Sequence, residues 1–344
     1  MRRSRIVLGL VVAVLVAAGV SVGVRVAADR RGSPARQAAV APAPSPVLAQ
    51  IPVDGKPRQL VLDADGLWAL TDRGLQRIDP SADRVESSTP LGIPTAYLGG
   101  LALSADAVWV PGVRSDLLWR VDRAANRVSG QVRLGQVLHG PVGVAAYGDS
   151  VWVTCCALEY GAPAGMLLRV DARRGRVTAR VPVPEGPMAV VADRDAVWVG
   201  TARGSLLRVD PVAAKVVGRV PPPDRRGRVQ ALSRGPGVLW VADTGAGAIR
   251  RFDLTAGRFD VGVTAPAPRN LAAGTGPDEA WVVTDLNQLL SRVDAGSGRR
   301  GPPVPVQYLG GVRGVAVGAG AVWVTTGDQV VRLDPSRVAR PSSG

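Results

Sequence analysis

The sequence is short of the side chains that carry out most enzyme chemistry. Its 344 residues include one histidine, His139, and two cysteines, Cys155 and Cys156. Because the cysteines are adjacent, the chain cannot carry a long-range disulfide framework. It also lacks a Gly-x-Ser-x-Gly nucleophile elbow and a phosphate-binding loop. The chain therefore lacks the motifs that identify many hydrolases and nucleotide-binding proteins.

Lysine is scarce as well, and this changes the meaning of the positive charge. The formal net charge is +14, and so basic a chain can bind nucleic acid or an anionic membrane. Only Lys56 and Lys215 are lysines, and the Arg-, Ala-, Val- and Gly-rich composition is typical of a GC-rich bacterial genome. Aromatic residues make up 4% of the chain, so few are left to stack on bases. Nucleic-acid binding through a basic surface is therefore only the second alternative function.

A long apolar run occurs only at the amino terminus. A basic head at 1–5 precedes residues 6–24, which are apolar or small throughout. A helix needs about 20 such residues to cross a bilayer, whereas the apolar region of a cleaved signal peptide spans roughly 7–15. We therefore predict a transmembrane signal-anchor at 6–24 with a cytoplasmic head, a Pro/Ala-rich linker at 25–45, and the rest of the chain outside the cytoplasmic membrane. Cleavage of the anchor, which would release a secreted protein, is the alternative.

The sequence has one motif in seven copies. Each copy places a tryptophan between apolar residues, then a short polar turn, then an Arg–apolar–Asp triplet. The tryptophans recur at intervals of 41 to 46 residues: Trp68, Trp109, Trp152, Trp198, Trp240, Trp281 and Trp323. The triplets begin at Arg77, Arg120, Arg169, Arg208, Arg251, Arg292 and Arg332. Self-similarity at this period indicates a repeat architecture.

Each copy has the pattern of four short strands. In the third copy we expect them at 142–146, 150–154, 167–171 and 177–183, separated by turns that contain Gly or Asp. Four strands in about 40–45 residues are the unit of a propeller blade, so the sequence predicts an all-β, seven-bladed β-propeller of four-stranded antiparallel blades. Each tryptophan would pack between neighbouring sheets. The Arg and Asp of the triplet would form turns and be solvated at the rim.

The two ends of the repeat region complement each other. The last copy lacks a fourth strand, whereas residues 46–57 resemble a fourth strand and the turn that follows it. We therefore expect residues 47–53 to pair with the outer edge of the last blade, which closes the ring and protects that edge. The propeller is predicted to span 46–336, followed by a disordered tail at 337–344.

The strand motifs resemble those of known bacterial propellers. With Pro/Gly-x-x-Val-Ala, then Val-Trp-Val, then Leu-x-Arg-Val-Asp, the chain resembles the YVTN-type and virginiamycin B lyase-like families over residues 46–336. For the lyase, the resemblance would imply histidine and glutamate chemistry with a bound divalent metal. Because His139 is the only histidine, no such centre is transferred to this chain, and no cofactor or metal is expected. The resemblance specifies the fold, since one propeller can host unrelated activities.

Three arginines are candidates for ligand binding at one mouth of the central channel. Aligning the inner strands places Arg58, Arg269 and Arg313 at equivalent positions of the first, sixth and seventh copies, which are neighbours in a closed ring. Three guanidinium groups there could hold a carboxylate or phosphate through bidentate hydrogen bonds. The alternative is that these side chains are hydrated surface charge, the default for arginine.

The third copy supplies a second group of candidates. Its connection between the second and third strands is the longest of the seven and carries Glu159 and Tyr160, and we expect His139 on the same face. Cys155 and Cys156 could be inert apolar side chains, a vicinal disulfide, or ligands of a soft metal together with His139. The inert interpretation is favoured over the disulfide, and the disulfide over the metal.

The sequence thus favours a non-enzymatic propeller that binds a ligand or another protein on the outer face of a bacterial cytoplasmic membrane. The expected partners are the membrane, through the amino-terminal helix, and an anionic small molecule or an envelope protein. A lyase or hydrolase that uses the face of His139 and Glu159 is the first alternative.

Overall fold

The computed structural model describes most of the chain after residue 43. The described residues are 44–92, 100–112, 115–135, 141–157, 164–224, 226–284, 288–305, 309 and 311–341. The predicted anchor at 6–24 and most of the predicted linker lie outside them. Within these ranges no helix is both long and apolar enough to span a bilayer. A 3-10 turn, η3 (Pro335–Arg337), follows the last strand.

Seven antiparallel sheets of four strands form the blades, confirming the predicted fold. Blade 1 contains β2 (Gln59–Asp63), β3 (Gly66–Leu70), β4 (Gly74–Asp79) and β5 (Arg84–Pro90). Blade 2 contains β6 (Ala102–Leu103), β7 (Ala107–Pro111), β8 (Leu117–Asp122) and β9 (Arg127–Arg133). Blade 3 contains β10 (Pro141–Tyr147), β11 (Ser150–Ala157), β12 (Ala164–Asp171) and β13 (Arg176–Pro182). Blade 4 contains β14 (Pro187–Ala192), β15 (Val197–Thr201), β16 (Leu206–Asp210) and β17 (Lys215–Val220).

The remaining three blades follow the same order. Blade 5 contains β18 (Val229–Gly235), β19 (Val238–Asp243), β20 (Ala248–Asp253) and β21 (Arg258–Thr264). Blade 6 contains β22 (Pro268–Ala273), β23 (Glu279–Thr284), β24 (Leu289–Asp294) and β25 (Arg299–Arg300). Blade 7 contains β26 (Val312–Gly318), β27 (Ala321–Thr326), β28 (Gln329–Leu333) and, from the other end of the chain, β1 (Val47–Pro52).

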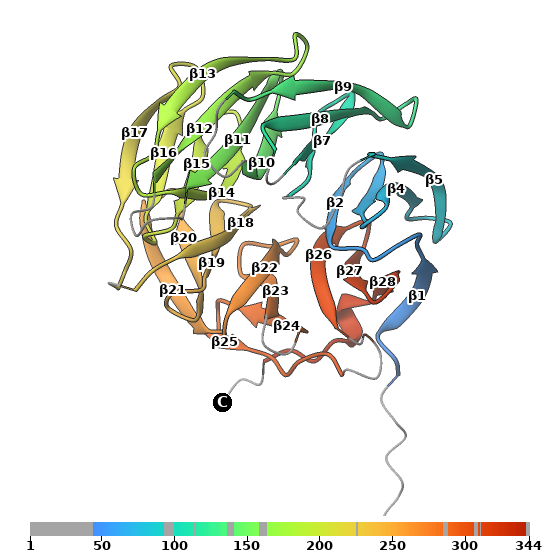
Figure 1. Cartoon of the computed structure of the whole chain (residues 1–344). Helices are drawn as coiled ribbons and strands as arrows, with labels where there is room; N and C mark the ends of the chain where they lie inside the picture. The colour runs from blue at the N-terminus through green and yellow to red at the C-terminus, as the bar shows by residue number, and fades with distance from the viewer. Residues whose placement is uncertain are drawn as a thin grey trace, which may run out of the picture. The chain divides into compact units, whose positions relative to one another are not determined.

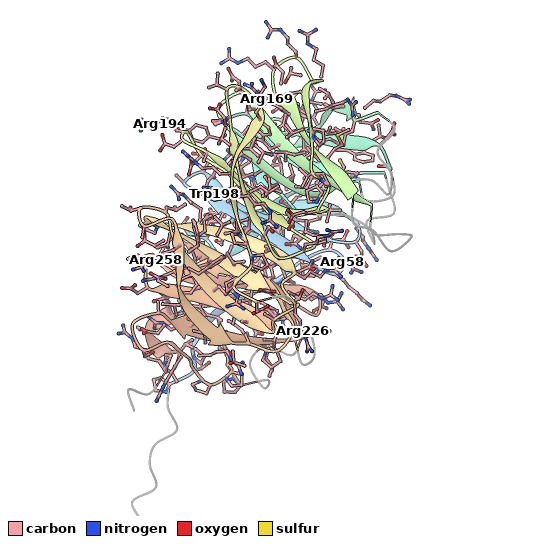
Figure 2. All side chains as sticks on the ribbon, turned by 90° about the vertical axis from the view of Figure 1, so that its left-hand side faces the viewer. Arg58, Arg169, Arg194, Trp198, Arg226 and Arg258 are labelled. Atoms are coloured by element: carbon pink, nitrogen blue, oxygen red, sulfur yellow. The ribbon has the colours of Figure 1, made fainter. Side chains whose placement is uncertain are left out.

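The blades form a ring whose inner strands contact one another around the full circle (Figure 1). The inner strands are β2, β6, β10, β14, β18, β22 and β26. We call the side on which these strands begin the entry face, and the side that carries the turns between third and fourth strands the turn face. In Figure 2, Arg58 and Arg226 lie toward the entry face on the right, and Arg194 and Arg258 toward the turn face on the left.

Strand β1 closes the ring as the sequence predicts. It pairs antiparallel with β28, with Ile51 opposite Val330 and Pro52 opposite Gln329. The Val53 N–H extends the ladder by donating to the Asp328 carbonyl oxygen at 3.0 Å. Ile51 is 1% exposed and packs into the core between blades 7 and 1. The last blade therefore has no exposed third-strand edge.

The repeated tryptophans pack between sheets, as expected. Buried apolar side chains form seven clusters, one at each blade junction, and each contains the tryptophan of the earlier blade. Trp109 of blade 2, for example, packs with Val144 and Val151 of blade 3. Six of the seven are at most 1% exposed, whereas Trp198 is 7% exposed.

The aspartate of each triplet forms the turn that the sequence predicts. Asp122 accepts hydrogen bonds from the backbone N–H groups of Ala124 and Ala125. One or both of these bonds recur at Asp79, Asp171, Asp210, Asp253, Asp294 and Asp334. The pKa of all seven carboxyls is lowered, because turn N–H groups, and first a serine hydroxyl at Asp79 and Asp334, hydrogen-bond to the charged form.

The arginine of the triplet differs from the prediction. The strand register places each triplet arginine opposite the tryptophan of its own blade. In five blades the guanidinium lies over the indole, with the Arg Cζ atom 5.5–6.0 Å from the ring centroid, for Arg77, Arg120, Arg169, Arg292 and Arg332. Cation–π contact stabilises such pairs. The expectation of simple solvation at the rim is therefore wrong for these five.

Candidate functional site

The three arginines of the predicted ligand site occupy one structural position. Arg269 of β22 and Arg313 of β26 lie where the register with the second strand shifts, which is a β-bulge. Arg58 directly precedes β2, and its backbone N–H donates to the Leu70 carbonyl oxygen at 2.8 Å. Val142, Met188 and Gln230 occupy the bulge in blades 3, 4 and 5. Bulges bend a strand and redirect a side chain, and they are frequent next to functional sites.

The main chains that carry these arginines are tied together across three blades. The Asn270 Nδ2 donates to Gln59 Oε1 at 3.2 Å and to the Arg313 carbonyl oxygen at 3.5 Å. Asn270 follows Arg269, and Gln59 follows Arg58. One side-chain amide therefore links blades 6, 7 and 1 beside the arginines.

The spacing between blades 7 and 1 depends on a glycine. A Cβ atom at Gly314 would lie 2.8 Å from the Arg58 carbonyl oxygen and 3.3 Å from the Gln59 Cα. A real Cβ essentially never comes this close to backbone, so a larger residue would push the strands apart. Gly314 thus permits the close approach of the strands that carry Arg58 and Arg313.

We call Arg58, Arg269 and Arg313 the arginine sector. Arg269 and Arg313 are exposed, and Arg58 is half-buried. The Nε of Arg58 is buried and has no hydrogen-bond acceptor in the described part of the chain. Buried donors in proteins are normally satisfied.

The second predicted group falls largely outside the described residues. His139, Glu159 and Tyr160 lie there, as does the side chain of Cys156, so their gathering and the vicinal disulfide stay predictions. Cys155 is 3% exposed and packs in the core between blades 2 and 3, an environment typical of an inert apolar cysteine. Across the described ranges, no three His, Cys, Asp or Glu side chains form a group suited to a metal ion.

Sequence reasoning missed Asn270 and Gln59. Neither belongs to the repeated motif, and their hydrogen bond joins residues 211 positions apart. A signal was available, because each is a polar residue that follows an arginine of the sector at the start of an inner strand. That signal predicts a contact only once the closed ring places Asn270 of blade 6 close enough to Gln59 of blade 1 to form a hydrogen bond.

Comparisons with known proteins support the fold. No family model and no curated protein sequence matches the chain. Virginiamycin B lyase from Staphylococcus aureus is similar in structure, with a TM-score of 0.70 and 16% identity, covering 83% of this chain and 98% of the lyase. The β-propeller domain of Cps50 (Swd1) from Myceliophteria thermophila has a TM-score of 0.69 and 13% identity, covering 85% of this chain and 99% of that domain. Hydrazine synthase from Kuenenia stuttgartiensis has a TM-score of 0.68 and 12% identity, covering 82% of this chain and 96% of that chain. At these identities the likeness is one of fold, and the chain is a seven-bladed β-propeller of virginiamycin B lyase-like architecture.

Proposed function

We propose that this chain is a non-enzymatic binding propeller that holds an anionic ligand at the arginine sector. The main support is the Asn270 amide, which bonds to strand β26 of blade 7 and to Gln59 of blade 1 and so links the three arginine-bearing segments on the entry face. A site that is already assembled binds a ligand without the entropy cost of ordering its residues. The fold itself suits a binding or scaffolding role.

The ligand class follows from the chemistry of the guanidinium group. Arginine presents N–H donors in a planar fork that matches the oxygens of a carboxylate or a phosphate. Arg269 and Arg313 are exposed, and Arg58 is half-buried. A small carboxylate or phosphate, or an acidic group on an envelope protein, matches this geometry and charge.

Calorimetric titration with inorganic phosphate and with citrate tests the arginine sector. The triple variant Arg58→Ala, Arg269→Ala, Arg313→Ala is expected to bind at least about tenfold more weakly, because charge-assisted hydrogen bonds contribute roughly 1.5–3 kcal/mol each. Unchanged affinity in this variant, or the absence of binding by the unmodified protein, contradicts the proposal.

A matched control separates the sector from general charge. The variant Arg176→Ala, Arg194→Ala, Arg258→Ala removes the same charge from three exposed arginines outside the sector. In Figure 2, Arg194 and Arg258 lie toward the turn face. This variant is expected to keep its affinity within about twofold, since exposed charges beyond a Debye length of roughly 10 Å are screened.

We further propose that residues 6–24 anchor the propeller to the outer face of the cytoplasmic membrane. The support is the length of this apolar stretch, which approaches the span of a bilayer helix. The protein should then remain in membranes after alkaline extraction and be degraded by protease added to spheroplasts. Release of a shortened chain into the medium would show cleavage instead.

The fold likeness to a virginiamycin B lyase supports one alternative, a lyase or hydrolase that uses His139 and Glu159. That alternative predicts a stoichiometric divalent metal in the purified protein and turnover that disappears in His139→Ala. Binding at the arginine sector should persist in the same variant, so the two functions can be told apart.

A further inference from the structure

Blade 4 departs from the pairing of arginine with tryptophan that most blades share. Trp198 of β15 and Arg208 of β16 are register partners, as Trp152 and Arg169 are in blade 3. Among the seven triplet arginines, all of them in the described ranges, Arg208 alone is exposed. Its side chain has no hydrogen-bond, ion-pair or ring partner in the described part of the chain. The guanidinium that is structural elsewhere is therefore available here.

Blade 4 also differs in its fourth strand, at the bulge residue beside the triplet arginine. In three blades this residue is polar and binds the guanidinium: Glu86 binds Arg77, Ser129 binds Arg120 and Asp260 binds Arg251. In blade 4 it is Val217, which is 56% exposed and offers no side-chain acceptor. Arg208 therefore lacks the side-chain acceptor that the bulge residue supplies in those three blades.

A cavity of about 370 Å³ opens beside Trp198 and Arg208, between blades 4 and 5. Ligand sites commonly measure about 300–1,000 Å³, so this space admits a small organic molecule. The turn before β15 and the facing side of blade 5 complete its walls. The residues that line it include Trp198, Arg208, Asp193, Asp195, Arg234 and Leu254.

The indole of Trp198, which lines this cavity, packs against a cluster of two phenylalanines. Phe252 meets Trp198 edge to face, with ring centroids 5.3 Å apart, and Phe259 meets Phe252 in the same way at 5.2 Å. These are the two phenylalanines of the sequence. Edge-to-face contacts of this kind contribute about 0.5–1.5 kcal/mol each beyond area burial. The cluster fixes Trp198, which at 7% exposure is the most accessible of the seven repeated tryptophans.

Among the arginines at this cavity, Arg208 is the one without a contact ion pair in the described residues. Arg234 pairs with Asp193 at 2.9 Å, and Asp195 pairs with Arg194 at 3.3 Å. Arg208 makes no contact ion pair in the described residues, although its charge helps to lower the pKa of Asp210, and it lines the cavity beside the largely buried indole of Trp198. A ligand with a single negative group and a flat apolar part satisfies both features.

We propose that the cavity between blades 4 and 5 binds a small aromatic carboxylate, with its carboxylate on Arg208 and its ring against Trp198 and Leu254. This site is separate from the arginine sector and does not depend on it. A small anion without a ring would leave the indole in contact with water. An uncharged aromatic molecule would leave Arg208 unpaired.

Phenylacetate is a suitable probe, and ligand-detected NMR with calorimetry measures its binding. The titration uses full-length protein that carries Arg58→Ala, Arg269→Ala and Arg313→Ala, so that the arginine sector cannot capture the carboxylate. We expect saturable binding of one phenylacetate with a dissociation constant of about 1 mM or lower, as befits so small a ligand. No saturation by about 10 mM overturns the proposal.

Two variants and a matched control locate the site. In the same background, Arg208→Ala should weaken binding about tenfold and Trp198→Leu at least about threefold, from the lost ion pair and ring contact. Arg176→Ala removes one exposed arginine of blade 3 and should change affinity by less than about twofold. Equal losses in Arg208→Ala and Arg176→Ala contradict the assignment, provided that circular dichroism shows all variants folded.

Two further probes test the two halves of the ligand. Acetate keeps the carboxylate without the ring, and benzyl alcohol keeps the ring without the charge. Each should bind at least about fivefold more weakly than phenylacetate, since each loses one of the two contacts. If acetate binds as well as phenylacetate, Trp198 has no role; if benzyl alcohol does, Arg208 has none. Either result contradicts the proposal.

Discussion

Blades 2 and 4 carry the same motif and use its arginine differently. In blade 2, Arg120 lies over Trp109 at 6.0 Å and donates to Ser129 Oγ at 2.6 Å. In blade 4, Arg208 is exposed, and Val217 takes the place of that serine. The comparison teaches that tryptophan and aspartate define the scaffold in every blade. In blades 1, 2 and 5 a bulge residue outside the motif binds the arginine, and in blade 4 that contact is absent.

Of the substitutions that compare the two blades, replacing the tryptophans should have the largest effect on the stability of the protein. Trp109→Ala should lower the free energy of unfolding by about 3–5 kcal/mol, because the residue is fully buried and leaves a cavity between two blades. Trp198→Ala should cost nearer 3 kcal/mol, since one side of this indole already faces a cavity. Guanidinium denaturation followed by circular dichroism measures both losses. A larger loss at Trp198 would contradict the structural difference between the blades.

Replacing the bulge residues of the fourth strands should reverse the difference between Arg120 and Arg208. Ser129→Val removes an acceptor from Arg120 and should destabilise the protein by about 1 kcal/mol. Val217→Asp should give Arg208 the partner that Asp260 gives Arg251 and weaken phenylacetate binding about tenfold. Calorimetry and denaturation on the same samples measure the two effects. Unchanged binding in Val217→Asp would show that Arg208 is not the ligand contact.

The smallest effect concerns the turn aspartates, which the two blades share. Hydrogen bonds donated first by the Ala125 and Ala213 N–H groups lower the pKa of Asp122 and Asp210 below the ordinary value of 3.8. A carboxyl whose pKa is lower in the folded state stabilises the fold above its unfolded pKa and loses that contribution as the pH falls through its folded pKa. Asp122→Asn and Asp210→Asn should therefore each lower the melting temperature slightly at pH 7, and the deficit should shrink below about pH 3.8. A deficit in one blade only would show that the two turns are not equivalent.

Much of the fold could be predicted because the same physical pattern occurs seven times. One tryptophan per copy sets the junctions between sheets, and one aspartate per copy sets the outer turn. The closing strand was also predictable, since residues 47–53 supply what the last copy lacks. These features are local in sequence or depend on counting strands, so three-dimensional information adds little to them.

The candidate sites were only partly predictable, because they depend on contacts between copies. Alignment of the repeats placed Arg58, Arg269 and Arg313 at one position, but the link from Asn270 to Gln59 exists only in a closed ring. The contact of arginine with tryptophan depends on cross-strand register, which the motif does not display. The sequence shows Val217, but only the pairing of β16 with β17 shows that this residue lies beside Arg208 and gives it no side-chain acceptor.

The pairing of β1 with β28 has a consequence for biosynthesis. Strand β1 leaves the ribosome before any blade, whereas its partner emerges after all the others, and Val47 and Leu333 meet across nearly the whole described chain. Contacts so distant in sequence form slowly, because a long loop must be closed first. Six blades can be complete while the seventh still lacks its outer strand, and during that interval β28 presents an open edge to other chains. We therefore expect the pairing of β1 with β28 to be among the last steps of folding.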